Sequence, residues 1–150
     1  MKMKAAFLVG KESFEVREVE RPKCGYGEAL VRVKACAVCG TDLRIFHDER
    51  RIDVPTAGHE ISGVIEEIGD GVKELAAGDR VIIETVVGCG ECDTCRRGEE
   101  NRCRHGFKAI GFQYNGGYAQ FLLAPREAVK QGCVIKIPDN VSFEEATIVE

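Results

Sequence analysis

The sequence has 150 residues, of which 44% are hydrophobic and 31% are charged, and its formal net charge is −4. These proportions are typical of a single globular domain that is large enough to bury a core. The negative charge argues against a nucleic-acid-binding protein, and no apolar run approaches the roughly eighteen residues that a membrane-spanning helix needs.

The predicted strands are short and are separated by turns that contain glycine. Runs rich in Val and Ile predict strands over residues 4–9, 13–19, 28–37, 61–68 and 80–87, and further strands are expected over 118–124 and 134–137. Gly69-Asp70-Gly71 and Gly78-Asp79 are among the turn signals between them. Short strands at this spacing are typical of a barrel or sandwich, so we predict a mainly β fold.

Two short helices are predicted. The first covers residues 41–46, and the second begins near residue 143, where Ser142 and Glu145 form a capping-box pattern. The second helix has about two turns before the sequence stops, and so short a helix is marginal in water unless its apolar face is packed. No G-x-G-x-x-G motif follows a strand. We therefore expect partner structure beyond residue 150; a small protein with a short terminal helix is the alternative.

Two motifs in the first half of the sequence could together form a metal site. Cys39-Gly40-Thr41-Asp42 follows the third predicted strand, and Gly58-His59-Glu60 precedes the fourth. Neighbouring side chains of a regular strand point to opposite faces, so His59 and Glu60 can approach one ion only if the backbone bends, as Gly58 would allow. Cys, His and Glu are a ligand set that catalytic zinc uses with one position left open. A lone cysteine is more typical of core packing, and a lone histidine more often makes a hydrogen bond in the core than binds a metal.

Four cysteines with the spacing Cys89-x2-Cys92-x2-Cys95-x7-Cys103 form the most specific motif in the sequence. Each C-x2-C step lets a turn direct two sulfurs at one ion. Because the protein supplies all four ligands, no position remains for a substrate, and the pattern predicts a structural zinc site. The negative charge of four thiolates could be offset by the arginines of this segment, which are Arg96, Arg97, Arg102 and Arg104.

Three other interpretations of the four cysteines are weaker. A ferredoxin-type iron–sulfur motif has its fourth cysteine after three residues and before proline, whereas here the interval is seven residues and Arg104 follows. A zinc ribbon has two separated C-x2-C pairs, with a basic face nearby. This chain instead has three closely spaced cysteines followed by a fourth, and its net charge is −4. Disulfides need an oxidising compartment, and the apolar run over 5–9 is too short for a secretory signal, so we expect reduced thiols in the cytoplasm.

At this point the sequence resembles the zinc-dependent medium-chain alcohol dehydrogenases. The resemblance runs along the whole chain through ordered motifs: Cys39-Gly40-Thr41-Asp42, Gly58-His59-Glu60-x2-Gly63-x5-Gly69-x2-Val72, Gly78-Asp79-Arg80-Val81, the cysteine cluster and Gly116-Gly117-Tyr118-Ala119. It implies that residues 1–150 are a GroES-like catalytic domain, a partly open β-barrel with a structural-zinc loop and short helices. The Rossmann domain that normally follows would be absent from this chain.

The resemblance also implies a set of catalytic-zinc ligands. Cys39 and His59 would bind zinc directly, and Glu60 would lie close enough to exchange with water as a ligand. The closing run over residues 144–150 looks like the polyol (sorbitol) and threonine dehydrogenase branch, in which a glutamate here lies at the zinc. Glu150 is therefore the candidate for the remaining carboxylate.

The residues after Cys39 would orient these ligands and move a proton. Asp42 would accept the spare N–H of His59 and fix its tautomer. Thr41 would connect the alcohol oxygen to a proton relay. The family commonly has histidine three residues after this threonine, but Arg44 occupies the position, and a guanidinium does not deprotonate in proteins. His47, just beyond, is the candidate to replace it.

The implied activity is oxidation of a secondary alcohol or polyol to a carbonyl compound, with hydride transfer to NAD or NADP held by the Rossmann domain of the parent chain. Zinc would act as a Lewis acid, and the nicotinamide would carry the redox chemistry. We expect a homo-oligomer as the full-length enzyme, and an isolated 1–150 chain that is inactive. Two alternatives stay open: a non-catalytic zinc-binding GroES-like interaction module, and a zinc-independent quinone reductase of the same fold.

Overall fold

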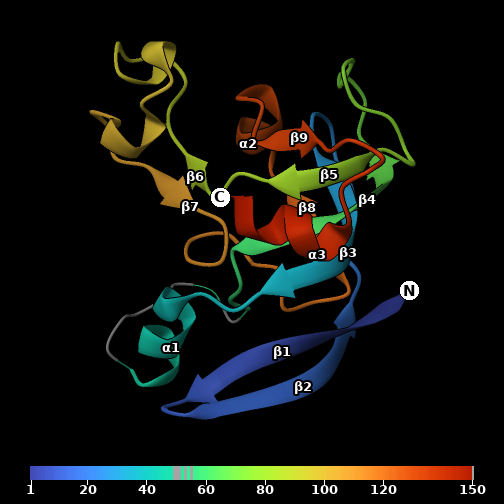
Figure 1. Cartoon of the computed structure of the whole chain (residues 1–150), viewed down its shortest axis with the longest axis vertical. Helices are drawn as coiled ribbons and strands as arrows, with labels where there is room; N and C mark the ends of the chain where they lie inside the picture. The colour runs from blue at the N-terminus through green and yellow to red at the C-terminus, as the bar shows by residue number, and fades with distance from the viewer. Residues whose placement is uncertain (49–51, 53, 55, 150) are drawn as a thin grey trace.

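The computed structural model describes residues 1–48, 52, 54 and 56–149 (Figure 1). Its centre is a five-stranded sheet in the order β8-β3-β4-β5-β9, in which all neighbouring strands are antiparallel. These strands are β3 (Ala29–Ala37), β4 (Glu60–Ile68), β5 (Arg80–Ile83), β8 (Phe121–Ala124) and β9 (Val134–Lys136). Strands β8 and β9 stand at opposite ends of this order, so the sheet does not close on itself. The mainly β prediction is confirmed.

A long hairpin lies beneath the central sheet in Figure 1. It consists of β1 (Lys2–Gly10) and β2 (Ser13–Glu20), paired in antiparallel register. Backbone bonds attach it to the segment before β8, since the Ala6 amide donates to the Tyr118 carbonyl at 2.8 Å and the Gln120 amide donates to the Lys4 carbonyl at 3.0 Å. Most of β2 is exposed, so the hairpin is anchored mainly through β1.

The core lies on one face of the central sheet. Alternate residues of the strands are buried there, as period-two side-chain geometry requires; Ile61 and Ile65 of β4 and Val81 and Ile83 of β5 are at most 2% exposed. The other buried members of this cluster come from several elements: Ala29, Val31, Val87, Ile110, Leu122, Ala124, Ala128, Cys133 and Val134.

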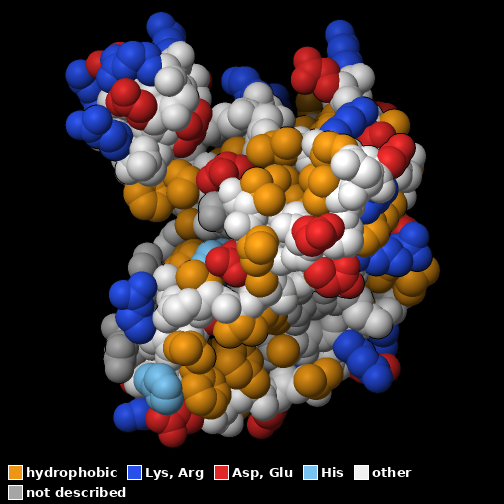
Figure 2. All heavy atoms as spheres, viewed as in Figure 1, with side chains coloured by type: hydrophobic (Ala, Val, Ile, Leu, Met, Phe, Trp, Pro, Cys, Tyr) orange, Lys and Arg blue, Asp and Glu red, His pale blue; other side chains and the backbone are white. Residues whose placement is uncertain are grey.

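A small lobe projects from the body of the molecule at the upper left of Figure 1. It contains β6 (Val86–Val87), β7 (Lys108–Ala109) and two 3₁₀ turns, η1 (Cys95–Arg97) and η2 (Glu100–Arg102). Figure 2 shows that side chains of both charge signs cover this lobe, whereas apolar side chains are more frequent on the body of the molecule. Within residues 88–107, all of which the structure describes, Cys95 is the only hydrophobic residue that is buried. The lobe therefore has no large apolar core of its own, and its fold must depend on another source of stability.

The described part of the chain also contains three short α-helices: α1 (Gly40–Phe46), α2 (Arg126–Lys130) and α3 (Phe143–Ala146), the last continued by the 3₁₀ turn η3 (Thr147–Val149). The predicted capping box is present, because the Glu145 amide donates to Ser142 Oγ at 3.1 Å and the Ser142 amide donates to Glu145 Oε2 at 2.9 Å. Ser62 Oγ donates to the Phe143 carbonyl at 2.7 Å and attaches α3 to β4. Among the described residues, no helix is long and apolar enough to cross a membrane.

Three details of the predicted elements were wrong. The strand expected over 80–87 is two strands, β5 and β6, because Thr85 turns to donate its hydroxyl to the His59 carbonyl at 2.9 Å. The strand expected over 118–124 begins at Phe121, since the residues before it bond to two other segments. Helix α2 was not predicted, because five residues are too few to show helical periodicity.

Ile65→Ala should lower the free energy of unfolding by about 2–5 kcal/mol, because it leaves a cavity in the core of the sheet. Ile135 of β9 has the same side chain but is 43% exposed, so Ile135→Ala should cost clearly less. Urea denaturation of both variants at a fixed zinc concentration measures the difference. Equal losses would contradict the placement of Ile65 in the core.

Candidate metal centres

The four cysteines of the lobe lie together. The ligand atoms of Cys89, Cys92, Cys95 and Cys103 are all within 4.8 Å of one another. Cys89 Sγ lies 3.9 Å from Cys95 Sγ, and Cys92 Sγ lies 3.4 Å from Cys95 Sγ. Four sulfurs about 2.3 Å from a tetrahedral zinc ion would be about 3.8 Å apart. The cluster therefore fits a structural zinc site, as its spacing predicted.

Hydrogen bonds within the lobe favour thiolate at two of these ligands. The amides of Glu91 and Cys92 donate to Cys89 Sγ at 3.4 and 3.3 Å, and these bonds lower the pKa of Cys89. The hydroxyl of Thr94 lies 3.0 Å from Cys92 Sγ and lowers the pKa of Cys92. Burial raises the pKa of Cys95. A bound cation is thus what would hold all four residues as thiolates together.

The arginines of the lobe bind carboxylates of the same lobe. Arg104 Nη2 lies 2.7 Å from Asp93 Oδ2, Arg97 Nη2 lies 3.2 Å from Glu99 Oε2, and Arg102 Nη1 lies 3.8 Å from Glu99 Oε2. These three arginines are thus paired with carboxylates. Their contribution to stability is small for exposed pairs, so the cluster remains the main candidate for what stabilises the lobe.

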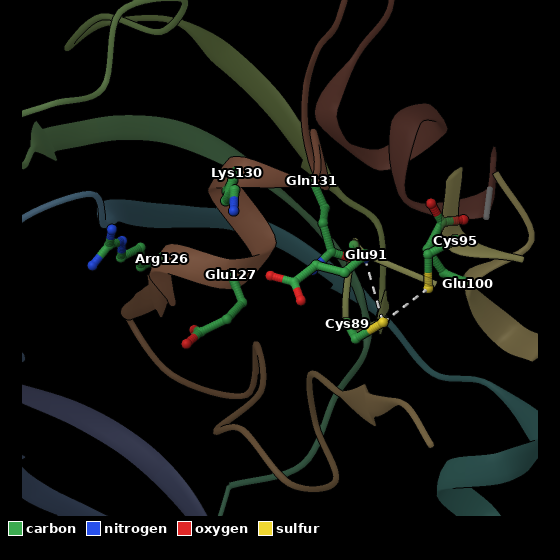
Figure 3. A pocket seen from close by; sticks show the side chains of 9 residues that line it. Cys89, Glu91, Cys95, Glu100, Arg126, Glu127, Lys130 and Gln131 are labelled. Atoms are coloured by element: carbon green, nitrogen blue, oxygen red, sulfur yellow. Dashed lines mark hydrogen bonds between the residues drawn. The ribbon is translucent and has the colours of Figure 1, made fainter. Parts of the chain in front are cut away.

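A cavity of about 400 Å³ separates the cysteine cluster from α2 (Figure 3). Its wall includes Cys89 and Cys95 on one side and Lys130 and Gln131 on the other, together with Glu127 of α2. Gln131 Nε2 donates to the Gly88 carbonyl at 2.8 Å, one residue before the first cysteine. This bond connects the end of α2 to the lobe.

The second group of candidate ligands lies at the start of α1 and the start of β4. The ligand atoms of Cys39, His59 and Glu60 are all within 4.8 Å of one another. Cys39 is the residue before α1, and Glu60 is the first residue of β4. Gly58 has a φ of +89°, so the backbone bends here as the sequence analysis required. The bend lets two neighbouring side chains approach the same point.

Residues far away in the sequence fix this bend. The amide of Gly117 donates to the Gly58 carbonyl at 2.9 Å, and that of Tyr118 donates to the Ala57 carbonyl at 3.1 Å. A Cβ atom on Gly116 would lie only 2.2 Å from the Gly58 carbonyl oxygen, so a side chain there would push the two segments apart. Together with the Thr85 hydroxyl on the His59 carbonyl, these contacts hold His59 from both sides. Nothing local in the sequence signalled this use of Thr85 and Gly116.

Asp42 lies behind the candidate ligands and contacts two of them. Its Oδ2 accepts the Cys39 amide at 3.0 Å, and its Oδ1 faces His59 Nδ1 at 3.6 Å. Asp42 and His59 are 5% and 8% exposed, and neither of these two facing atoms has a hydrogen-bond partner among the described residues. The separation is slightly longer than a hydrogen bond. With Nδ1 directed at Asp42, the other ring nitrogen of His59 is the one left for a metal ion.

The charges of this group stabilise one another. Asp42, followed by Cys39, raises the pKa of His59 to about 9 against the opposing effect of burial. Burial would raise the pKa of Asp42, but His59 and the Cys39 amide outweigh it and lower that pKa. The amide of Thr41 is the main cause that lowers the pKa of Cys39, with contributions from His59 and the Thr41 hydroxyl. The site thus favours an anionic sulfur beside a positive charge, and a divalent ion that bound here would replace one proton of His59.

The predicted relay residues lie at the two ends of α1. Thr41 is in its first turn, where Arg44 Nη2 donates to Thr41 Oγ1 at 3.2 Å. His47 follows the last helical residue, and its Nδ1 lies 2.8 Å from Glu12 Oε1 in the turn of the hairpin. His47 is therefore paired with Glu12 in this structure. Glu150, the predicted further carboxylate ligand, lies outside the described residues.

Comparison with known proteins gives a consistent result. Residues 25–139 match the family model of the alcohol dehydrogenase GroES-like domain. The chain is 46% identical over 151 aligned residues to an alcohol dehydrogenase of Geobacillus stearothermophilus, and the match covers 96% of this chain and 42% of that protein. It is 35% identical over 148 residues to an L-threonine 3-dehydrogenase of Idiomarina loihiensis, covering 95% of this chain and 42% of that protein.

The fold is also similar to solved structures. A thermostable alcohol dehydrogenase from Pyrobaculum aerophilum, solved with cobalt and zinc bound, superposes with a TM-score of 0.85 at 30% identity, covering 99% of this chain and 45% of that one. The chain thus spans less than half the length of the relatives that it matches.

Cys95→Ser should remove about one zinc ion per chain and lower the melting temperature strongly, because structural zinc binding contributes folding free energy on the order of 10 kcal/mol. Cys24→Ser is the matched control, since Cys24 belongs to neither group of ligands and its thiol donates to the Glu28 carbonyl. Metal analysis and thermal melting of both variants are the measurements. Full zinc content with an unchanged melt in Cys95→Ser would refute the structural assignment.

Asp42→Asn should weaken zinc binding at the second site by roughly 10–100-fold, because a ligand histidine loses the group that orients it. Zinc at the four cysteines should be unaffected. Competition with a chromogenic chelator measures both affinities, and the exposed Asp139 gives the control Asp139→Asn. If the variant bound both ions as the wild type does, Asp42 would have no role behind His59.

Proposed function

The chain belongs to the zinc-dependent medium-chain alcohol dehydrogenase family, and we propose that it is the catalytic domain of an enzyme that oxidises a secondary alcohol to a carbonyl compound. Hydride would pass to NAD or NADP. The observation that carries the proposal is the convergence of Cys39, His59 and Glu60 from two distant segments, with Asp42 behind them. A fold made only for binding has no need of this set.

Zinc, when bound by Cys39, His59 and Glu60, would supply Lewis acidity that lowers the pKa of the alcohol substrate. The residues of the chain do the rest. Asp42 holds the Nδ1 side of His59 and so fixes which nitrogen is offered to the ion. The bend at Gly58, held by the Gly117 amide, keeps His59 and Glu60 together.

Thr41 is the residue that would bind the alcohol oxygen and take its proton. Arg44 can only donate hydrogen bonds, so one lone pair of the Thr41 oxygen accepts from Arg44. The other lone pair would accept the alcohol proton while the hydroxyl proton of Thr41 passes to a water molecule. His47 stands six residues further along α1, about 9 Å along the helix axis. The proposed proton route from Thr41 to His47 therefore needs water molecules between them.

The parent enzyme is proposed to be longer than this chain. Its Rossmann domain would bind the nicotinamide, in agreement with relatives that are more than twice the length of the match. A polyol or threonine substrate is supported by the similarity to a threonine dehydrogenase and by the run over residues 144–150, of which Glu150 would be a further zinc ligand. We also propose a homo-oligomer in the cytoplasm, where all eight cysteines would stay reduced as they are here.

A non-catalytic zinc-binding module is the alternative proposal. It accounts for the four-cysteine cluster but gives no reason for the buried Asp42 facing His59. Zinc content separates the two proposals. Two ions in the wild type and one in His59→Ala support the dehydrogenase, whereas one ion that survives His59→Ala supports the module.

In the full-length protein, His59→Ala should abolish oxidation of secondary alcohols with NAD or NADP, because the catalytic ion is lost. The isolated 1–150 chain should show no turnover, since hydride transfer needs a nicotinamide within about 3–3.5 Å of the reacting carbon. Formation of reduced nicotinamide with a panel of secondary alcohols, polyols and threonine is the assay. Sustained turnover by residues 1–150 that disappears in His59→Ala would contradict the two-domain proposal.

A further inference from the structure

Arg44 stands beside the candidate catalytic site without taking part in it as a metal ligand. It lies one turn after Thr41 on α1, and its guanidinium donates to the Thr41 hydroxyl at 3.2 Å. Thr41 in turn faces the sulfur of Cys39 with both its amide and its hydroxyl. The guanidinium is therefore two contacts away from a proposed zinc ligand, on the side of the residue that would bind the substrate oxygen.

The guanidinium has no carboxylate partner among the residues that the structure describes. This is unlike most of the other arginines, which form ion pairs; these are Arg17, Arg21, Arg32, Arg80, Arg97, Arg102 and Arg104. A guanidinium has five N–H donors, and the bond to Thr41 uses one of them. Because the Arg44 side chain is exposed, its other donors can be reached by a ligand.

The charges at the site give a physical reason for a positively charged side chain at Arg44. A thiolate at Cys39 and a carboxylate at Glu60 would together neutralise a divalent ion, and Asp42 adds another negative charge behind them. The metal centre alone would therefore not attract an anionic substrate. Arg44 adds a fixed positive charge next to it, in the planar form that matches a carboxylate with two parallel hydrogen bonds.

We propose that Arg44 is a specificity-determining residue that binds a carboxylate group of the substrate, so that the enzyme prefers hydroxy acids to neutral secondary alcohols. This inference rests on the proposed function and names its substrate class. Thr41 holds one edge of the guanidinium, and the remaining donors face a carboxylate one or two carbons from the hydroxyl-bearing carbon. Arg44 cannot relay a proton, but at this position it can bind the carboxylate of the substrate.

The test compares 3-hydroxybutyrate with its methyl ester, which lacks the charge and carries one extra methyl group, in the full-length, zinc-loaded enzyme. The wild type should show kcat/KM about 10–100-fold higher for the acid, the range expected of a charge-assisted hydrogen bond. Arg44→Gln should lose most of this preference, with a much smaller change for the ester. Arg44→Lys should keep part of this preference, because lysine keeps the positive charge but cannot form two parallel hydrogen bonds to a carboxylate.

Lys11→Gln is the matched control. It removes one positive charge in the turn between β1 and β2. This turn lies close to α1, because the amide of Glu12, the residue after Lys11, donates to the carbonyl of Phe46 at the end of α1 at 2.7 Å. It should leave the acid-to-ester ratio as it is in the wild type. An equal loss of the ratio in Lys11→Gln and Arg44→Gln would overturn the proposal, because general electrostatics would then explain the preference.

Two further outcomes separate the proposal from its rivals. Equal kcat/KM for acid and ester in the wild type overturns it. The proposal is also overturned if Arg44→Gln lowers kcat/KM equally for both substrates and raises the KM for the nicotinamide. That result would assign the guanidinium to a cofactor phosphate. If the wild type oxidised neither of these substrates nor any member of the panel of secondary alcohols, polyols and threonine, the proposed function would fail by itself. Calorimetric binding of acetoacetate and its methyl ester would then decide the role of Arg44: tighter binding of the acid that Arg44→Gln removes supports the proposal, and equal binding overturns it.

Discussion

The close contact between two glycines and the backbone before β4 is the constraint on which the candidate catalytic site depends. Gly116 lies against the Gly58 carbonyl, where a Cβ atom would be only 2.2 Å away, and the Gly117 amide bonds to the same oxygen at 2.9 Å. This contact stabilises the positive φ of Gly58, which in turn directs His59 and Glu60 to one point. A side chain at Gly116 would therefore alter the metal site without touching a ligand.

The first turn of α1 supplies the opposite wall of the same site. Asp42 accepts the amide of Cys39 and faces His59, so one buried carboxylate sets the position of two ligands that belong to different segments. Thr41 lies in this first turn of α1, and Arg44 lies one turn later. Any shift of α1 would thus move a candidate zinc ligand, the carboxylate that faces His59, and the hydroxyl and guanidinium proposed to bind the substrate together. Precision at the reacting atoms then depends on how firmly this short helix is packed.

The two metal centres differ in what they require from the fold. The four cysteines lie within a single stretch of fifteen residues, and local turns with backbone amides on sulfur bring them together. The lobe that holds them is covered with charged side chains, so the metal would replace the core that it lacks. The second site gathers its candidate ligands from the ends of the paired strands β3 and β4, so it requires the pairing of two segments that are distant in the sequence.

The sequence by itself determined the mainly β fold, the capping box at α3, the four-cysteine cluster and the need for a bend at Gly58, because each depends on local spacing or local backbone preference. Its motifs also suggested Cys39, His59 and Glu60 as a candidate zinc ligand set, and the family resemblance added Glu150 and the roles of Thr41 and Asp42. Only the tertiary structure decided that Thr85 interrupts a strand to hold His59, that Gly116 packs on Gly58, and that His47 pairs with Glu12. These contacts join residues far apart in the chain, and no local pattern encodes which distant segment will supply a partner.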